Sequence, residues 1–317
     1  MHIFVTGATG YIGSAVTREL AAAGHEVVGL ARSEAAAATL RARGIGVHRG
    51  DMNDHESLRR AAAAAGGVIH TAFINPSPTT DYAAASAVDA AAIEAIGAGL
   101  EGTDKPLVVT SATGLVSVSG RPGTESDPAT WGPRVAGERA AMALADKGVR
   151  AVVLRLSISV HDGRTDRAGF VPGLIARARA TGVSAYVGDG SNRWTAVHLL
   201  DAVDAYRIAL EAPPAAVLHA VDEEALPFRL IAEEIGARLG LPVVSLSPDD
   251  ASGHFGYLAR FVAHDNPTSS AATRSRFGWA PRNRGLLEDI AHGGYLPAEP
   301  SAASTGRRRP LHGRGEG

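Results

Sequence analysis

The amino-acid sequence predicts an α/β fold in which a doubly wound parallel sheet is followed by a smaller C-terminal lobe. Three observations lead to this prediction. Short apolar runs alternate with helix-like stretches through residues 1–156, as expected for a parallel sheet covered by helices on both faces. A glycine-rich turn directly follows the first apolar run. Beyond residue 156 the alternation becomes irregular, which indicates a second region that shapes a pocket.

The first half of the chain supplies the expected sheet and its helices. The strands are short and rich in Val, Ile and Leu, which is typical of strands buried in a parallel sheet. Pro133 suits the first turn of a helix, where its missing N–H group is not needed. Residues 114–132 are rich in Gly, Ser and Pro, and we expect a surface loop there. The expected strands are residues 2–6, 26–30, a short one near Val47, 67–70, 107–110 and 150–156, and the expected helices are 14–23, 34–43, 57–65, 82–100 and 133–146.

The second half has a looser pattern of helices and short strands. The chain from residue 297 onward consists mainly of Ala, Ser, Gly and Arg, and we expect a disordered tail. The predicted organisation is a sheet-forming region at 1–156, a partly interleaved lobe at 157–296 that shapes a pocket, and the tail at 297–317. The expected helices are residues 171–180, 200–211, 228–239 and one beginning near Leu286, and the expected strands are 185–187, 217–220 and 243–246.

Composition excludes several classes of function. The chain has 317 residues, 45% hydrophobic and 20% charged, with a formal net charge of −2. This balance gives no reason to expect nucleic acid or an anionic membrane as a partner. No apolar run approaches the roughly 20 residues of a membrane-spanning helix. The first strand begins at residue 2 and leaves no room for a signal peptide, so we expect a cytoplasmic protein.

The residue types also limit the possible chemistry. The absence of cysteine excludes disulfides, thiolate metal sites and a cysteine nucleophile. Neither a His-Glu-x-x-His metal motif nor a Gly-x-Ser-x-Gly nucleophile turn occurs. We therefore expect no metal site.

A glycine-rich stretch, Thr6-Gly-Ala-Thr-Gly-Tyr-Ile-Gly13, lies between the first strand and the first helix. A strand, a glycine-rich turn and a helix N-terminus in this order form a phosphate cradle, because backbone N–H groups and the helix dipole face the anion. The spacing is G-x-x-G-x-x-G rather than the commonest dinucleotide fingerprint, G-x-G-x-x-G. We expect this turn to bind a dinucleotide through Gly7, Thr9, Gly10, Tyr11 and Ile12.

The end of the second strand indicates which dinucleotide is bound. An NAD site usually places a carboxylate there for the ribose hydroxyls, whereas NADP needs positive charge for its 2′-phosphate. This chain has Arg32 at that edge and no acidic residue beside it. A guanidinium suits phosphate oxygens. The expected cofactor is therefore NADP(H).

The ends of the third and fourth strands supply the remaining expected cofactor contacts. Asp51 and Met52 follow the third strand, where the carboxylate can accept from the adenine amine and the thioether can cover the ring. Thr71, Ala72 and Phe73 follow the fourth strand, and small residues there let the backbone lie along the cofactor.

Two neighbours of these residues are expected to be structural. Asp54 is better placed than Asp51 to cap the next helix. His70 can be interpreted as a catalytic base, but at a strand end we expect a partly buried histidine whose ring nitrogens are satisfied.

These features together resemble the short-chain dehydrogenase/reductases. The glycine-rich stretch and the strand ends at 50–51, 69–72 and 110–112 are similar to that family's motifs. The resemblance covers about residues 1–296 and implies a Rossmann fold, a nicotinamide cofactor and a homodimer through the helices after the fourth and fifth strands. The segments that resemble the extended, epimerase-like branch are residues 154–156, 188–190, 197–201 and 277–281.

The resemblance also implies a catalytic serine after the fifth strand and a Tyr-x-x-x-Lys pair on the next helix. In that family the tyrosine is the general acid/base, and the lysine holds the nicotinamide ribose. Ser111 matches the serine, with Thr113 as the alternative if the alignment slips. The pair itself is absent: one alignment puts Thr130 and Arg134 in its place, and the other puts Arg134 and Glu138 there.

Arg134 can replace the lysine only in part. A guanidinium stays protonated, so it can bind ribose hydroxyls or stabilise an oxyanion but cannot supply a proton. A surface ion pair between Arg134 and Glu138 is the structural alternative. The chain has six tyrosines, and all of them lie elsewhere in the sequence, at positions 11, 82, 186, 206, 257 and 295.

The proton donor is therefore open. His161 and Tyr186 are the best candidates from the second half, whereas His198 is expected to be structural. Ser111 can relay a proton from water. A substrate with its own acidic group, such as a phenol, makes a dedicated acid unnecessary.

The sequence thus predicts an atypical NADPH-dependent reductase of a carbonyl or conjugated double bond in a small molecule, with Ser111, Arg134 and His161 as catalytic residues. A non-catalytic NADP(H)-binding sensor or scaffold is the alternative that loss of the Tyr/Lys pair predicts. Sugar-nucleotide epimerisation is weakened, because that chemistry depends on the missing tyrosine.

Overall fold

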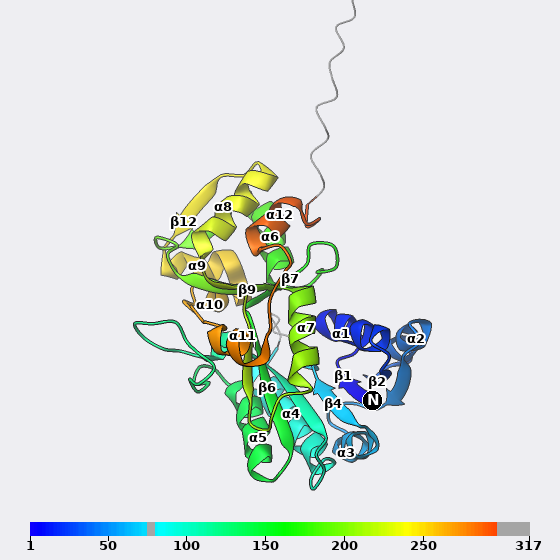
Figure 1. The fold of residues 1–317 in the computed structure, drawn as a ribbon. Coiled ribbons are helices and arrows are strands. Elements are labelled where there is room, and N and C mark those ends of the chain that lie inside the picture. The colour runs from blue at the N-terminus through cyan, green and yellow to red at the C-terminus, as the bar shows by residue number, and fades with distance from the viewer. Residues whose placement is uncertain (75–79, 297–317) are drawn as a thin grey trace, which may run out of the picture.

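Seven parallel strands form the main sheet of the protein, in the order β10-β6-β5-β4-β1-β2-β3. The computed structural model describes residues 1–74 and 80–296, and it confirms the predicted fold class (Figure 1). The strand order reverses between β1 and β4, and ligands of doubly wound sheets bind at such a point. The strands are β1 (His2–Thr6), β2 (Glu26–Ala31), β3 (Gly46–Arg49), β4 (Gly67–His70), β5 (Pro106–Ala112), β6 (Arg150–Leu156) and β10 (Val217–Ala220).

The register aligns the carboxyl ends of the central strands. Thr6 of β1 pairs with His70 of β4, and His70 pairs with Val109 of β5. Residues that follow these three strands therefore meet at one edge of the sheet.

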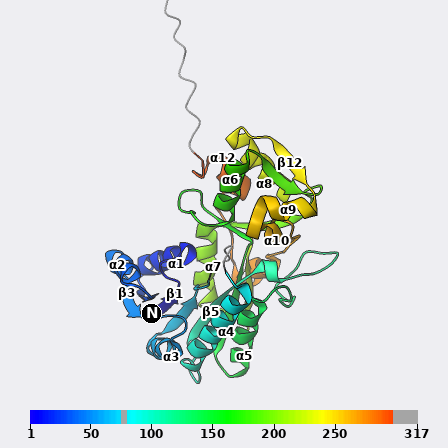
Figure 2. The same cartoon turned by 180° about the vertical axis from the view of Figure 1, so that it is seen from behind.

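Helices cover both faces of the sheet, and the two views in Figure 1 and Figure 2 show them from opposite sides. One core contains Ile3, Val108 and Leu154 from the strands together with Leu20 and Tyr206 from the helices. The core on the other face joins strand residues to the second helix layer. The first layer contains α1 (Tyr11–Ala22), α2 (Glu34–Ala42) and α7 (Leu199–Ala209), and the second contains α3 (His55–Ala64), α4 (Tyr82–Ala98) and α5 (Val135–Asp146).

The C-terminal lobe lies above the carboxyl edge of the sheet in Figure 1. It contains a three-stranded sheet, β11-β9-β7, and a parallel pair, β12-β8. Trp194, Phe228 and Ile231 lie in its core. Its elements are β7 (Ser159–His161), α6 (Phe170–Thr181), β8 (Ser184–Val187), β9 (Arg193–His198), β11 (Glu223–Pro227), α8 (Phe228–Leu239), β12 (Val243–Leu246), α9 (Pro248–Phe255), α10 (Ala259–Val262) and α12 (Leu286–His292); α11 (Ala271–Phe277) contacts β10 of the main sheet.

The predicted elements differ from the observed ones mainly in the lobe. The strands β7, β9 and β11 were not predicted, because each is short and is stabilised by pairing with a distant segment. In the main sheet, α1 begins at Tyr11 rather than at residue 14, and β5 extends to Ala112. The disordered tail predicted at 297–317 lies outside the described residues.

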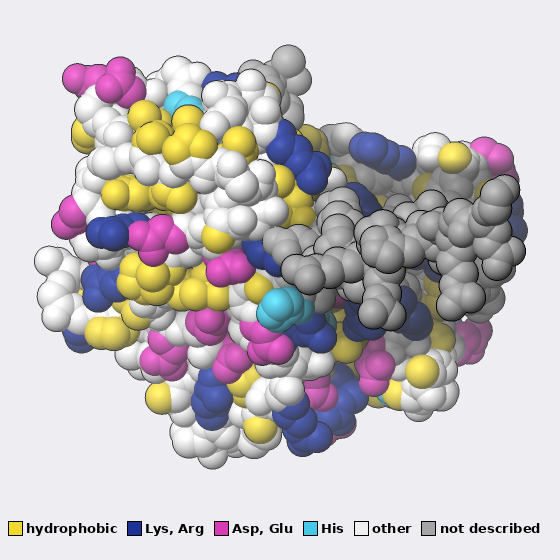
Figure 3. Space-filling model, turned by 90° about the horizontal axis from the view of Figure 1, so that it is seen from above, with side chains coloured by type: hydrophobic (Ala, Val, Ile, Leu, Met, Phe, Trp, Pro, Cys, Tyr) yellow, Lys and Arg dark blue, Asp and Glu magenta, His cyan; other side chains and the backbone are white. Residues whose placement is uncertain are grey.

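Acidic, basic and apolar side chains are interspersed over the face that includes the C-terminal lobe (Figure 3). In the described part of the chain, no helix combines the length and the apolar character needed to cross a bilayer. Nor do these residues contain a group of three or more His, Asp or Glu side chains arranged to hold a metal ion.

Candidate active site at the carboxyl edge of the sheet

The glycine-rich turn after β1 depends on residues that have no side chain. Gly7 has a φ of +68°, and its carbonyl accepts from the Gly10 N–H at 2.9 Å. A Cβ on Gly7 would lie 2.7 Å from both Thr71 Oγ1 and the Ala72 nitrogen. A Cβ on Gly13 would lie 2.2 Å from the Gly7 oxygen. The turn therefore packs against β4 so closely that only glycine fits.

This turn leaves the N-terminus of α1 open to an anion. Gly10 is the N-cap, and no described side chain caps the helix. The uncapped N–H groups and the dipole of a 12-residue helix attract phosphate. The predicted contacts through Gly7, Thr9, Gly10 and Ile12 thus fit the pyrophosphate of a dinucleotide.

The Tyr11 side chain does not take part in this cradle. Its hydroxyl is buried beside Thr165. Burial raises the pKa of Tyr11 well above its usual value, and the nearby carboxylates of Asp166 and Asp162 raise it further. The Tyr11 hydroxyl thus faces the lobe, and only its backbone remains available to phosphate.

The predicted adenosine contacts lie together beyond β2 and β3. Arg32 is exposed, and its positive charge helps to hold the pKa of Asp51 below its usual value. The larger cause of that shift is Asn53, whose backbone N–H and side-chain Nδ2 donate to Asp51 Oδ1 at 3.0 and 2.7 Å. Met52 packs against the core beside α3. Asp54 caps α3 by accepting from the Ser57 N–H at 3.1 Å, as predicted.

The residues at the end of β4 tie this strand to β1. Thr71 Oγ1 donates to the Thr6 carbonyl at 2.7 Å, and the Ala72 N–H donates to Thr6 Oγ1 at 3.3 Å. His70 is buried, with Nδ1 2.8 Å from Thr6 Oγ1 and Nε2 3.1 Å from Asp89 Oδ1. Both ring nitrogens of His70 have partners, as predicted, and the ring is more deeply buried than expected.

Ser111 lies at the end of β5, but its hydroxyl faces a buried ion pair. It donates to Glu138 Oε2 at 2.7 Å, and Glu138 is paired with Arg155 of β6. Ser111 itself is only 3% exposed. This geometry contradicts the expectation that Ser111 orients a substrate oxygen, because its proton is already bonded inside the core. It also contradicts the alternative of a surface Arg134–Glu138 ion pair.

The Arg134 side chain lies at the edge between β4 and β5. Its guanidinium carbon is 4.1 Å from the centre of the Phe73 ring, and Nη2 is 3.4 Å from the Thr110 carbonyl oxygen. Its Nε is buried and has no hydrogen-bond partner among the described residues. Arg134 therefore presents a positive charge beside Phe73, a partly buried residue that is one of the predicted cofactor contacts.

Sequence reasoning missed Tyr82, the first residue of α4. Its ring meets the Phe73 ring edge-on at 5.8 Å, and the Arg260 guanidinium lies 4.7 Å above its centre. Burial raises the pKa of the Tyr82 phenol, and the charges of Arg134 and Arg260 oppose that rise. Within residues 1–74 and 80–296 its hydroxyl has no hydrogen-bond partner. The sequence feature that could have pointed to Tyr82 is its position at the start of the helix that follows β4, the strand whose end was predicted to contact the cofactor.

The other expected proton donors do not reach this edge. His161 is fully buried, and its Nδ1 is 2.9 Å from Asp289 Oδ2. Its Nε2 is also buried and has no hydrogen-bond partner among the described residues, and the expectation that His161 donates a proton stays a prediction. Tyr186 is in β8 of the lobe, where the Arg229 guanidinium lies 5.8 Å from its ring centre. His198 caps α7 by accepting from the Leu200 N–H, as expected of a structural histidine.

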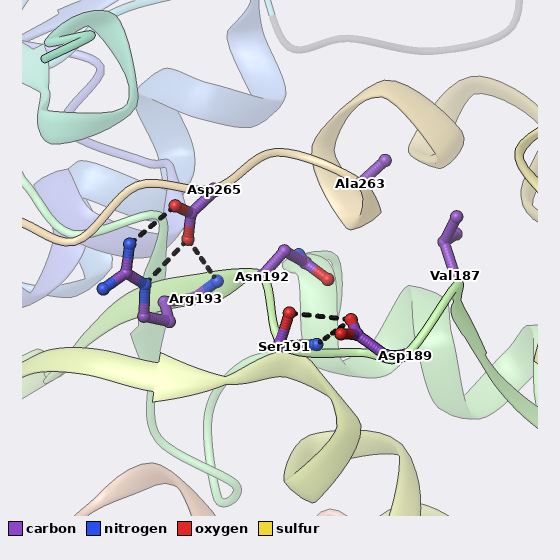
Figure 4. A pocket seen from close by; sticks show the side chains of 7 residues that line it. All are labelled: Val187, Asp189, Ser191, Asn192, Arg193, Ala263 and Asp265. Atoms are coloured by element: carbon purple, nitrogen blue, oxygen red, sulfur yellow. Dashed lines mark hydrogen bonds and ion pairs between the residues drawn. The ribbon is translucent and has the colours of Figure 1, made fainter. Parts of the chain in front are cut away.

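A cavity of about 490 Å³ opens in the lobe beside the turn between β8 and β9 (Figure 4). Its polar side chains largely bond to one another: Asp189 accepts from Ser191, and Arg193 pairs with Asp265. Neither Tyr82 nor Arg134 lines it. Tyr82 and Arg134 at the carboxyl edge of the sheet therefore belong to a different part of the described structure from this cavity.

The comparison with known families agrees with this architecture. The sequence profile described as "NAD dependent epimerase/dehydratase family" matches residues 3–127 and 132–219. The chain belongs to this family. The expected resemblance to the epimerase-like branch is confirmed, and a nicotinamide dinucleotide is the typical cofactor of the family.

Relatives and solved structures extend this result. Uncharacterized protein C2A9.02 of Schizosaccharomyces pombe is 48% identical over 299 residues, which cover 93% of this chain and 100% of that protein. The 2-alkyl-3-oxoalkanoate reductase of Stenotrophomonas maltophilia is 32% identical over 261 residues, 77% of each chain. The dTDP-glucose 4,6-dehydratase DesIV of Streptomyces venezuelae, solved with NAD and TYD, shares the fold with a TM-score of 0.74 at 18% identity, over 93% of this chain and 96% of that one.

Proposed function

We propose that the protein is an NADPH-dependent reductase acting on a carbonyl group or a conjugated double bond of a small molecule. One observation supports this most directly. Tyr82 and Arg134, which come from different helices, meet around Phe73 at the carboxyl edge of β4 and β5. A phenol next to a fixed cation is the combination that the family's missing Tyr/Lys pair would supply.

The cofactor would be held by residues along the same edge. The backbone of Gly7, Gly10 and Ile12 would bind the pyrophosphate, and Arg32 would bind the 2′-phosphate. NADPH, when bound, supplies the hydride. The preference for NADPH is part of the proposal and depends on Arg32.

Tyr82 and Arg134 would together take the roles of the family's missing tyrosine and lysine. Arg134 stays positively charged and stabilises negative charge on the substrate oxygen. Tyr82 donates the proton to that oxygen. Because burial raises its pKa, the phenol remains protonated at neutral pH, as a proton donor must.

The reductase relative supports the reaction type. The protein from Stenotrophomonas maltophilia is named as a reductase of 2-alkyl-3-oxoalkanoates, which are small molecules with a carbonyl group. A similar carbonyl substrate for this chain is consistent with the Tyr82–Arg134 pair.

The test is NADPH oxidation against a panel of oxo acids, ketones, quinones and enones. With an active substrate, Tyr82→Phe should lower kcat by about 10²–10⁴-fold, because the proton donor is lost. The affinity for NADPH, measured by fluorescence titration, should not change. Tyr186→Phe removes a hydroxyl in the lobe and should keep kcat within about twofold of wild type. Full activity of Tyr82→Phe would exclude Tyr82 as the donor.

A non-catalytic NADP(H)-binding sensor is the second candidate. It is favoured by the burial of Ser111 and Glu138 in a core ion-pair network, which leaves neither free for chemistry. Tight NADPH binding without oxidation by any compound of the panel would support this candidate over the reductase.

A further inference from the structure

Two arginines, Arg134 and Arg260, lie near Tyr82, and neither pairs with a carboxylate in the part of the chain that the structure describes. We propose that Arg260, together with Arg134, binds a carboxylate of the substrate, so that the substrate is an oxo acid rather than a neutral carbonyl compound. This proposal rests on the proposed reductase function and specifies its substrate class.

Neither guanidinium has an acidic partner among the described residues. Among residues 1–74 and 80–296, no Asp or Glu oxygen lies within 4.0 Å of the Arg134 or Arg260 guanidinium. Many other arginines of the protein do pair with a carboxylate. Examples are Arg41, Arg59, Arg121, Arg155 and Arg193.

Both guanidiniums pack against aromatic rings. Arg134 lies 4.1 Å from the Phe73 ring centre, and Arg260 lies 4.7 Å from those of Tyr82 and Phe261. A cation on an aromatic face is positioned without losing its charge or its N–H donors. The planar guanidinium then matches the two oxygens of a carboxylate.

The nearby acidic side chains, Asp81 and Asp89, are bonded to groups other than the two arginines. Asp81 caps α4 and accepts from the Ala83 and Ala84 N–H groups, both at 3.0 Å. Asp89 is buried and bonded to His70. Among residues 1–74 and 80–296, neither carboxylate lies within ion-pair distance of Arg134 or Arg260, although the charge of Asp89 also acts on the Tyr82 phenol.

The same cap argues against a diphosphate ligand. Because the Asp81 side chain caps the N-terminus of α4, the backbone N–H groups of Ala83 and Ala84 are not free to bind phosphate beside the two guanidiniums. The open helix N-terminus at α1 lies beside β1 and serves the cofactor. A single carboxylate matches the charge and the donors that the site offers.

The test measures binding, so it does not depend on turnover. Isothermal titration calorimetry of the NADP⁺-saturated protein would compare 3-hydroxyhexanoate with its methyl ester. Wild type should bind the acid at least about tenfold more tightly than the ester. Arg260→Met keeps an unbranched apolar side chain over Tyr82 and Phe261, and it should lower this ratio to about one while ester affinity changes little.

Arg179→Met, which alters an exposed arginine of α6, is the matched control and should retain the wild-type ratio. Circular dichroism checks that each variant is folded, and Arg260→Lys, which restores a charge, should recover part of the preference. Equal wild-type affinity for acid and ester, or an unchanged preference in Arg260→Met, would overturn the proposal. Tighter binding of UDP-glucose than of either probe would also overturn it.

These outcomes are separable from failure of the proposed function. The protein could show a carboxylate preference that depends on Arg260 and yet oxidise no NADPH with any panel compound. That result would support the carboxylate site and reject the reductase function. If NADPH oxidation were as efficient with neutral ketones as with oxo acids, the reductase function would be supported and the carboxylate site rejected.

Discussion

Arginine and lysine differ in the property that matters most at position 134. A guanidinium stays protonated in proteins, whereas burial readily lowers the pKa of a lysine. Arg134 lies over the Phe73 ring, and its Nε has no hydrogen-bond partner among the described residues. Because it is an arginine, it places a permanent positive charge there. In the proposed reductase this charge stabilises an oxyanion, and the proton has to come from a second group, which we assign to Tyr82.

Arg32 is the residue on which the choice of dinucleotide depends. Arg32→Asp replaces the cation with the carboxylate typical of NAD sites. The affinity for NADPH should fall by about 10- to 100-fold, since a charge-assisted hydrogen bond contributes about 1.5–3 kcal/mol. The affinity for NADH should be much less affected. Fluorescence titration of both reduced dinucleotides measures the two changes.

The control for this prediction is Arg43→Asp, which makes the same charge change at the C-terminal end of α2. It should leave both affinities within about twofold of wild type. An equal loss of NADPH and NADH affinity in Arg32→Asp would reject the 2′-phosphate assignment.

At the scale of the elements, α5 is attached to the sheet by a charged residue inside the core. Glu138 of α5 accepts from Ser111 of β5 and pairs with Arg155 of β6. Arg155 continues the network to His219 of β10, 3.1 Å away. Removing one member of a buried ion pair typically costs 3–5 kcal/mol. This packing role explains why Ser111 and Glu138 are not free to act on a substrate.

The turn between β1 and α1 allows the cofactor cradle to be tested with two glycines. Gly7 and Gly24 both have positive φ, +68° and +82°, so alanine is strained at either position. Only at Gly7 would the new Cβ also collide, 2.7 Å from the Ala72 nitrogen, whereas nothing lies within 4 Å at Gly24.

We therefore expect Gly7→Ala to lower NADPH affinity by at least about tenfold and to destabilise the protein by more than Gly24→Ala. Gly24→Ala should lower the free energy of unfolding by about 1 kcal/mol and leave the affinity unchanged. Urea denaturation and fluorescence titration measure these effects. Similar affinities for the two variants would show that the turn does not contact the cofactor.

At the scale of the whole molecule, His219 of β10 connects the main sheet to the chain just before α11. Its Nδ1 donates to the Ser269 carbonyl at 2.7 Å, and its Nε2 accepts from Arg155. The bond from Arg155 needs the neutral ring, because Nε2 can accept only when it carries no proton. Burial and, to a smaller extent, the charge of Arg155 together lower the pKa of His219 to about 4.

This shift predicts how stability depends on pH. The unfolded His219 has a pKa near 6.5, so between about pH 6.5 and pH 4 the unfolded state binds more protons than the folded state. The free energy of unfolding should therefore fall as the pH drops through this range, with a contribution from His219 of at most about 1.4 kcal/mol per pH unit. Urea denaturation at several pH values measures the slope.

His219→Gln keeps an acceptor for Arg155 without a titrating ring, so the slope should become shallower. Part of the slope should remain, because burial also lowers the pKa of His48, His198 and His264. An unchanged slope in His219→Gln would show that this histidine does not couple stability to pH.

Local patterns predicted much of this molecule. The bounds of β1, β4, β6, β10, β12 and α8 follow from apolar runs and punctuating residues, and they match the structure. The short strands β7, β9 and β11 were missed, because they are stabilised by pairing between distant segments rather than by their own sequence.

By itself, the sequence determined the fold class and the phosphate cradle, because a glycine-rich turn between a strand and a helix is a local geometry. It also showed that the family's tyrosine and lysine are missing. The tertiary structure was needed to show which side chains lie together at the sheet edge. The partners of Ser111, Arg134 and Tyr82 depend on which way each side chain points and on which helices meet at the sheet edge. Such contacts join residues far apart in the chain, and no local pattern records them.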